Sequence, residues 1–276
     1  MRKSLKWIFL ALVLLFIYAP ILVLVVYSFT DATTIGPIRS FSMHNFETLF
    51  TTPELLRMII GTILLAVVSA IIASVLGTMG AIGAFYSKKR RKKIISTLNQ
   101  IPVVNADVVT AFSLCILLVV VIGISKDTYI PLVAGHVTLS APFVYLSVLP
   151  KLKQMDSSLY EAALDLGATP ATALRKIVIP YIAPGIASGF MLSITLSLDD
   201  YFIATYTKPA TFDTISTYVV NATKGSQTDI KTALWALATV IFAVVVIIVI
   251  AANIRGNKKA NAAVGNIGMG KEAAVR

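Results

Sequence analysis

Long apolar runs separated by short polar segments dominate this chain. Six runs are long enough to cross a bilayer, because a spanning helix needs about 20 predominantly apolar residues. The predicted spans are about 7–27, 58–86, 101–123, 129–150, 182–206 and 232–252. The pattern therefore predicts an all-α membrane protein with six transmembrane helices and a transmembrane domain over 1–252. Residues 253–276 are small, polar and rich in Gly and Ala, and are predicted to form a disordered tail.

The basic residues predict how these spans are oriented. The chain has 276 residues, of which 57% are hydrophobic and 13% charged, and its net charge is +11. If the N-terminus lies inside, 18 of the 24 Lys and Arg residues fall in cytoplasmic segments, including the run at 88–93. Cytoplasmic loops carry the excess of Lys and Arg, so both termini are expected in the cytoplasm. Anchoring to membrane lipid then accounts for the positive charge, and no nucleic-acid partner is expected.

Candidate catalytic and metal-binding residues are sparse. Cys115 is the single cysteine, and His44 and His136 lie in different environments, so no metal site is predicted. No Ser/His/Asp spacing suggests an enzyme, and His136 is interpreted as a packed, hydrogen-bonded residue. The segment 265–271 is similar to a phosphate-binding loop, but Glu272 stands where Ser or Thr is required. The chain itself is therefore expected to bind no cofactor and to catalyse no reaction.

A polar segment at 151–181 interrupts the apolar pattern between the fourth and fifth predicted spans. Its fixed positions are Glu161, Ala162, Ala163, Gly167, Ile177, Ile179 and Pro180. A helix that starts at Glu161 presents small side chains to another protein. Gly167 is predicted to end or bend this helix, and Pro180 to block its continuation into the fifth span. The predicted orientation places the segment in the cytoplasm, where a partner protein that uses ATP can bind it.

Three acids lie in apolar surroundings and are candidates for lining a solute path. A carboxylate in a membrane span costs about 2.5–3.5 kcal/mol, so such groups should face a bundle interior or a water-filled path. Asp199 and Asp200 are adjacent, about 100° apart on a helix, and the sequence leaves open which of them lines the path. Ser197 shares the face of Asp200. Asp107 is expected at a second station, nearer the cytoplasmic exit.

Acids without matching intramembrane Lys or Arg favour a cationic solute. The ring of Tyr201, together with neighbouring aromatic rings, is suited to ammonium groups through its face. A long, thin polycation such as spermidine fits this chemistry, so a small cationic substrate is predicted.

The polar segment resembles the EAA loop of bacterial ABC importer permeases, whose pattern is E-A-A-x3-G-x9-I-x-L-P. Only Ile179 departs from that pattern. The chain from about 7 to 252 further resembles the spermidine/putrescine permease subunits of these importers. That resemblance is carried by Tyr27-Ser28-Phe29, Ile101-Pro102 with Asp107, the EAA loop and the run Ser197-Leu198-Asp199-Asp200-Tyr201.

The resemblance implies a binding-protein-dependent type I importer fold in the bacterial inner membrane. It implies a second, homologous permease subunit, two ATP-binding subunits that carry ATP and Mg, and an external solute-binding protein. Coupling to the ATPases would fall on the conserved positions of the EAA loop, which here are Glu161, Ala162, Ala163 and Gly167. ABC permeases for ferric iron, sulfate or thiamine share the scaffold and remain alternatives. A secondary transporter is a further alternative, which would require internal symmetry.

Overall fold

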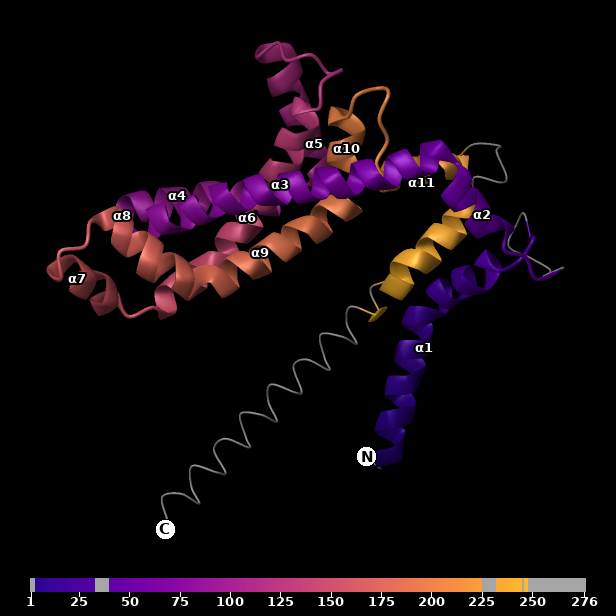
Figure 1. Ribbon diagram of the computed structural model, residues 1–276, viewed down its shortest axis with the longest axis horizontal. Coiled ribbons are helices and arrows are strands. Elements are labelled where there is room, and N and C mark those ends of the chain that lie inside the picture. Colours follow the sequence, from indigo (N-terminus) through magenta and orange to yellow (C-terminus); the bar gives the residue numbers. More distant parts are fainter. Residues whose placement is uncertain (1–2, 33–39, 225–231, 245, 248–276) are drawn as a thin grey trace. The chain divides into compact units, whose positions relative to one another are not determined.

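The computed structural model describes residues 3–32, 40–224, 232–244 and 246–247, and their regular structure is helical. One isolated β-bridge joins Thr30 and Phe41. The predicted all-α fold is therefore confirmed (Figure 1). The chain divides into two compact units, which are described separately: Met1–Pro53 with Ala222–Arg276, and Glu54–Asn221.

The first unit contains α1 (Lys3–Ser28), α2 (His44–Thr51) and the apolar helix Thr232–Val244. Two aromatic pairs connect α1 to the last of these helices. Tyr27 packs edge-on against Trp235 with ring centroids 5.7 Å apart, and Tyr18 lies 6.4 Å from Phe242.

The end of α1 is held by a side chain of α2. The amide nitrogen of Asn45 donates to the backbone carbonyls of Ser28, at 3.2 Å, and Thr30, at 3.0 Å. The first of these bonds satisfies a carbonyl group that the helix end leaves without a partner, and the second holds the chain just after the helix.

The sixth predicted span is only partly described. Its helix reaches Val244, whereas 248–252 and the tail predicted to be disordered, 253–276, lie outside the described residues.

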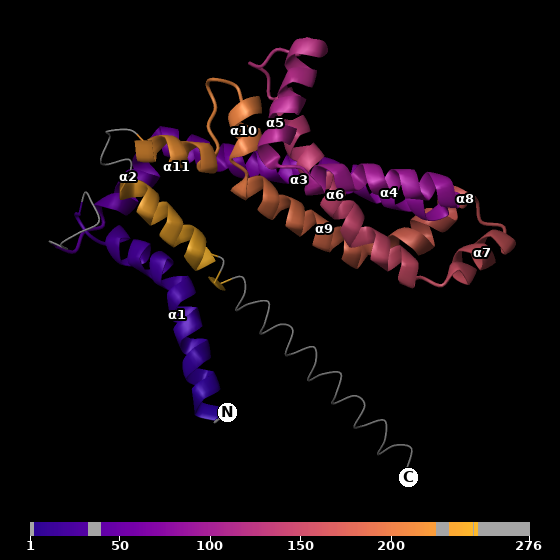
Figure 2. The same cartoon turned by 180° about the vertical axis from the view of Figure 1, so that it is seen from behind.

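The second unit is built on three long apolar helices. These are α3 (Pro53–Tyr86), α6 (Ile130–Gln154), and a helix over Pro170–Asp199 that ends in α9 (Ile179–Asp199). Figures 1 and 2 both show α6 and α9 side by side, and these two helices make the most extensive contact in this unit. The connection between them carries α7 (Ser157–Asp165), so α7 joins one end of a packed pair.

Pro180 does not block the helix, so that prediction is wrong. Helix α8 (Pro170–Ala173) passes into α9 through a π-helical turn, η2 (Leu174–Val178). The backbone N–H of Ile179 donates to the carbonyl of Leu174, five residues earlier. The π-helical pattern ends just before Pro180, which therefore occupies the first turn of α9, where the missing N–H of a proline is tolerated.

The third predicted span is also wrong as a single helix over 101–123. Helix α4 (Lys89–Val104) begins within the basic run and continues through Pro102. It is followed by α5 (Asp107–Cys115) and η1 (Ile116–Val121), with a bend of 105° at the break. Asn105 and Ala106 are extended, and the amide of Asn105 donates to the hydroxyl of Thr110 at 2.9 Å. This local bond fixes the turn into α5.

The fifth predicted span ends earlier than expected. Helix α9 stops at Asp199, Asp200 is extended, and the chain resumes as α10 (Phe202–Thr207) and then α11 (Ile215–Lys224). Over the described residues, four helices are long and apolar enough to cross a membrane, or five if α4 with α5 and η1 counts as one span.

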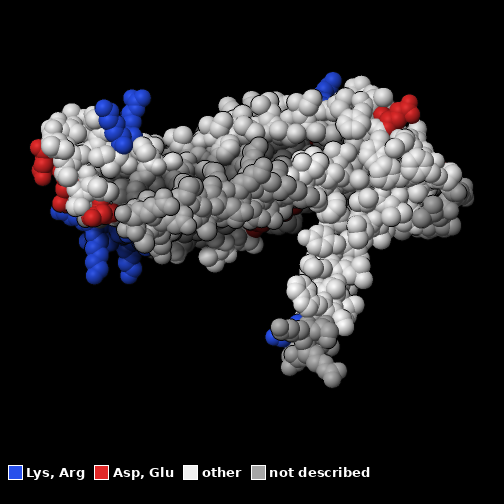
Figure 3. All heavy atoms as spheres, turned by 60° about the horizontal axis from the view of Figure 1, so that its bottom comes forward, with Lys and Arg blue, Asp and Glu red and all other residues white. Residues whose placement is uncertain are grey.

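The basic side chains collect at one end of the second unit. Figure 3 shows Lys and Arg gathered over the end that carries α4, α7 and α8. Contributing residues include Lys89, Arg90 and Arg91 of α4, and Arg175 and Lys176 of η2, the turn that follows α8. This end is the one that the charge pattern predicts to face the cytoplasm.

A core of small and branched side chains joins α3, α6 and α9, with Ala73, Val144, Val148, Leu152 and Ile182 among its buried members. The close approach of α3 to α6 depends on a glycine. A Cβ atom built on Gly77 would meet the carbonyl oxygen of Ala141 and the Cβ of Val144, both at 2.6 Å.

We expect Gly77→Ala to lower the melting temperature of the purified transporter, because overpacking a well-packed core costs about 1–3 kcal/mol. Gly83 lies on the same helix, and a Cβ atom there meets nothing within 4 Å. Gly83→Ala should therefore leave the melting temperature unchanged or raise it, since Ala is favoured over Gly in a helix by about 1 kcal/mol. Equal shifts in thermal unfolding for the two variants would contradict this account of the helix contact.

Candidate coupling helix and carboxylate site

The helix α7 has a defined start and a defined stop. It begins after Asp156, whose carboxylate accepts a hydrogen bond from the backbone N–H of Ser158 at 3.0 Å. This bond lowers the pKa of Asp156 below its ordinary value. The prediction that the helix starts at Glu161 is therefore wrong: Glu161 lies in the second turn, because the preceding Asp caps the helix four residues earlier than the motif suggests.

The stop at Gly167 is confirmed. Gly167 has φ +83°, in the left-handed region that favours glycine. Its N–H donates to the carbonyl of Leu164 at 2.9 Å, and the N–H of Ala168 donates to that of Ala163 at 3.0 Å. This pair of bonds is a Schellman motif, which turns the chain sharply away from the helix axis.

The exposed surface of this segment is small and partly apolar. Glu161, Ala162 and Gly167 are exposed, whereas Ala163 is buried against the rest of the chain. Leu166 is 89% exposed, and a Cβ atom built on Gly167 meets nothing within 4 Å. Sequence reasoning missed Leu166, although a leucine directly before the glycine of a helix stop is a visible signal. Three of the four predicted coupling residues are thus free to meet a partner, and Ala163 is not.

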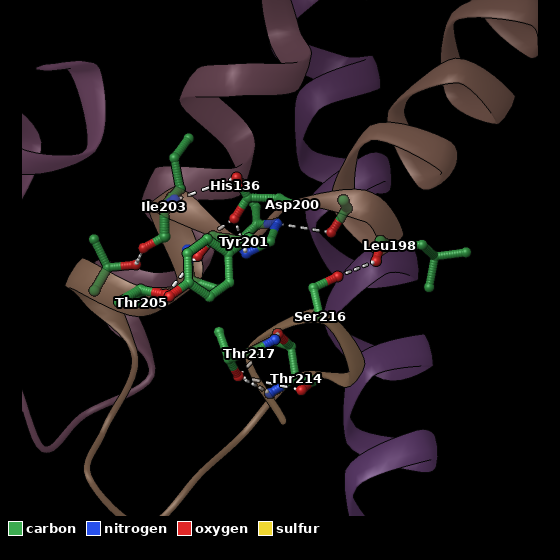
Figure 4. A network of polar contacts seen from close by, with 12 residues as sticks. His136, Leu198, Asp200, Tyr201, Ile203, Thr205, Thr214, Ser216 and Thr217 are labelled. Atoms are coloured by element: carbon green, nitrogen blue, oxygen red, sulfur yellow. Dashed lines mark hydrogen bonds and ion pairs between the residues drawn. The ribbon is translucent and has the colours of Figure 1, made fainter. Parts of the chain in front are cut away.

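The two adjacent acids have different environments. Asp199 is the last residue of α9 and is exposed, whereas Asp200 is buried at the corner between α9 and α10. The Asp200 carboxylate accepts hydrogen bonds from the backbone N–H groups of Ile203, at 3.2 Å, and Ala204, at 2.8 Å (Figure 4). Asp200 thereby caps the N-terminus of α10.

A histidine from α6 reaches the same corner. The Nδ1 atom of His136 lies 2.8 Å from the hydroxyl of Ser197, and its Nε2 atom lies 3.7 Å from Oδ2 of Asp200 (Figure 4). His136 and Ser197 are both buried. The interpretation of His136 as a packed, hydrogen-bonded residue is confirmed. Sequence reasoning did not place it in this cluster, because 61 residues separate it from Ser197.

These three residue types also make up hydrolase triads, a combination that the sequence spacing did not suggest. Here Ser197 is only 1% exposed, and its hydroxyl has no open side from which a substrate can approach. A nucleophile needs such access. The cluster therefore links helices and does not form a catalytic centre.

Asp107 and Asp199 both offer free carboxylates near this corner. Within the described part of the chain, neither side chain forms a hydrogen bond or an ion pair, and both are exposed. Asp107 begins α5, which packs against α10, and Asp199 ends α9, so both acids lie on elements that border this corner. The expectation that Asp107 occupies a second station, nearer the exit, stays a prediction. Asp107 follows the bend after α4, at the start of a helix that packs against α10.

Aromatic rings line the elements next to the acids. Tyr201 is half-buried, and its ring packs edge-on against Phe202 with centroids 5.3 Å apart. Tyr206 of α10 packs in the same manner against Phe112 of α5, at 5.8 Å. The structure thus brings acids and aromatic rings from α5, α9 and α10 into one region.

A protein with several apolar helices, an exposed short helix on a packed pair and acids near a helix break has the features of a membrane permease. The chain belongs to the family of binding-protein-dependent transport system inner membrane components, whose profile matches residues 74–255. It is accordingly a multi-pass transport subunit of the inner membrane and not an enzyme.

Similar proteins cover nearly the whole chain. It is 32% identical over 239 residues to the spermidine/putrescine transport system permease protein PotC of Haemophilus influenzae, covering 87% of this chain and 91% of that protein. It is 31% identical over 253 residues to the putrescine transport system permease protein PotI of Escherichia coli, with 90% and 89% covered. Among solved structures, a bacterial ABC transporter that imports the acidic polysaccharide alginate matches with a TM-score of 0.69 and 22% identity, covering 90% and 92%. This last likeness supports the fold.

Proposed function

We propose that this chain is a permease subunit of an ATP-driven polyamine importer, with spermidine and putrescine as the solute class. The observation that carries the proposal is a pair of exposed carboxylates, Asp107 at the start of α5 and Asp199 at the end of α9, on elements that border the Asp200 corner. A free carboxylate in a membrane protein is costly unless it serves a path, and a cluster of such charges attracts cations. The relatives named for spermidine and putrescine point to the same chemistry.

In this proposal the two adjacent acids have separate tasks. Asp199 offers its carboxylate to an ammonium group of the solute, and Asp107 offers a second one. Asp200 and Ser197 hold the corner in shape from behind. The ring of Tyr201 supports the solute by contact with its methylene groups or its charge. The difference in exposure supports this division, because Asp199 is exposed and Asp200 is buried.

In this proposal, partner subunits that bind ATP supply the energy for transport. Two cytoplasmic ATP-binding subunits, which carry ATP and Mg, dock on the exposed side of α7 at Glu161, Ala162, Leu166 and Gly167. Closure of the ATPases moves α7, and with it the packed pair α6 and α9. A second, homologous permease completes the path, and an external solute-binding protein delivers the polyamine. Alternating access then follows from a two-state rocking of the spans.

The reconstituted complex tests this assignment against its alternatives. We expect its ATPase activity to rise when the solute-binding protein carries spermidine or putrescine, because these solutes fit the acidic cluster. The comparison uses the same complex and binding protein with sulfate, thiamine or ferric iron. Stimulation by one of these three solutes, without stimulation by either polyamine, would replace the polyamine assignment while leaving the permease class intact.

A further inference from the structure

We infer that His136 is a positioning residue that ties the substrate corner to the helix pair moved by the ATPase. The proposal deepens the proposed function, since it rests on Asp199 as a residue of the solute path. His136 contacts neither solute nor solvent, because its side chain is fully buried. It therefore acts through the residues around it.

The helices α6 and α9 form a packed pair with α7 at one end, and this pair is called the lever. They pack so closely that a Cβ atom built on Gly189 would meet the Cα of Val144 at 2.9 Å. Along α6, His136 and the last residue, Gln154, are separated by about 27 Å at roughly 1.5 Å per residue. A displacement of α7 is thus carried along a tightly packed pair toward the end where the acids lie.

At the end of the lever away from α7, the helix is interrupted between α9 and α10. Helix α9 stops at Asp199, and the extended Asp200 leads into α10, so backbone hydrogen bonding is interrupted where the solute acids sit. His136 spans this interruption from α6. One ring nitrogen meets Ser197 before the break, at 2.8 Å, and the other faces Asp200 after it, at 3.7 Å.

The second of these contacts points to a role beyond simple packing. The Nε2 atom of His136 is buried and has no hydrogen-bond partner over the described residues, yet it faces a buried carboxylate. The same carboxylate already holds two backbone N–H groups of α10. The His136 ring therefore connects α6, the end of α9 and the start of α10. Through these contacts it fixes the position of Asp199 relative to the lever.

A thiol-labelling experiment reads this connection without any solute. Cys115 is the single cysteine, so Cys115→Ser followed by Asp199→Cys gives a chain with one thiol at the corner. Within the complete complex, the reaction rate of this thiol with a charged maleimide is measured without nucleotide and after trapping with ATP and vanadate. We expect the two rates to differ at least about fivefold, the lower end of ordinary coupling between sites.

The His136 variants then decide the proposal. In His136→Leu the difference between the two rates should fall below about twofold, less than ordinary coupling gives. His136→Asn restores a polar atom near Ser197 and should recover most of the rate difference seen in the parent. Ser140→Ala on the same helix removes a buried hydroxyl that has no partner over the described residues, and it should behave as the parent. Ser197→Ala breaks the same contact from α9 and serves if His136→Leu does not assemble.

Two results would overturn the inference: an unchanged rate difference in both His136→Leu and Ser197→Ala, or no difference in the parent. Spermidine uptake by the unmodified complex is measured in parallel. Its absence would remove the polyamine assignment alone, because the labelling result does not depend on the solute.

Discussion

Asp199→Asn is expected to lower polyamine uptake by about 10- to 100-fold, since a charge-assisted hydrogen bond contributes about 1.5–3 kcal/mol and each 1.4 kcal/mol is tenfold. The substitution keeps the side-chain volume and removes the charge. Because Asp199 is exposed and its side chain forms no hydrogen bond or ion pair over the described residues, assembly of the complex and its basal ATPase activity should be unchanged. Uptake of labelled spermidine into proteoliposomes measures the loss.

The neighbouring acid gives a contrasting result in the same assay. Asp200→Asn should reduce the yield and melting temperature of the complex, because the buried carboxylate accepts two backbone N–H groups and an amide cannot accept both with equal geometry. Ser188→Ala is a matched control for the exposed side of α9, since Ser188 is exposed and its hydroxyl donates to the carbonyl of Pro184 on the same helix. Loss of uptake in Asp200→Asn, together with full uptake in Asp199→Asn, would reverse the assigned roles.

Gly167→Leu is expected to abolish coupling while the permease still reaches the membrane. The side chain would project into open space on the side where we propose that the ATPase docks, and the positive φ of Gly167 adds a backbone cost of about 1–3 kcal/mol. Uptake and the stimulation of ATPase activity by the loaded binding protein should fall together.

Gly123 separates the docking effect from the backbone cost. It also has a positive φ, of +81°, and open space around a built Cβ atom, but it lies in the loop after η1. Gly123→Leu should therefore retain coupling. Gly167→Asn, with a residue that tolerates the left-handed region, should be milder than Gly167→Leu. Equal loss of coupling in Gly123→Leu and Gly167→Leu would show that backbone strain, and not docking, accounts for the defect.

The apolar pattern predicted the helices well and their interruptions poorly. α1, α3 and α6 follow directly from long apolar runs. The break after α4 and the corner after α9 depend instead on side chains that hold extended residues, Asn105 with Thr110 and Asp200 with α10. An apolar run does not reveal where such a polar contact forms, because the turn itself brings the two groups together.

Pro180 gave the opposite error, since a helix break was predicted there and the helix continues. Pro180 directly follows a π-helical turn. The rearranged hydrogen-bond pattern of that turn accommodates the missing N–H of the proline. The start of α7 was missed for a simpler reason: Asp156 followed by two serines is a helix-start signal of its own, and the EAA motif drew attention to a later residue.

The candidate site was predictable in its residues and not in its arrangement. Sequence reasoning found Asp107, Asp199 and Asp200 because charges stand out in apolar runs. It could not tell the exposed acid from the buried one, since the environment of Asp200 depends on its contacts with α10 and with His136, which form only in the folded chain.

Spermidine uptake by the variant with both Asp107→Asn and Asp199→Asn tests the central claim most directly. This variant removes the two exposed charges and leaves the Asp200 cap in place, so the complex should assemble and hydrolyse ATP. In proteoliposomes that contain ATP, with the loaded binding protein outside, the unmodified complex should accumulate labelled spermidine and the double variant should not. Accumulation at the unmodified rate by the double variant would contradict the cation path and, with it, the polyamine assignment.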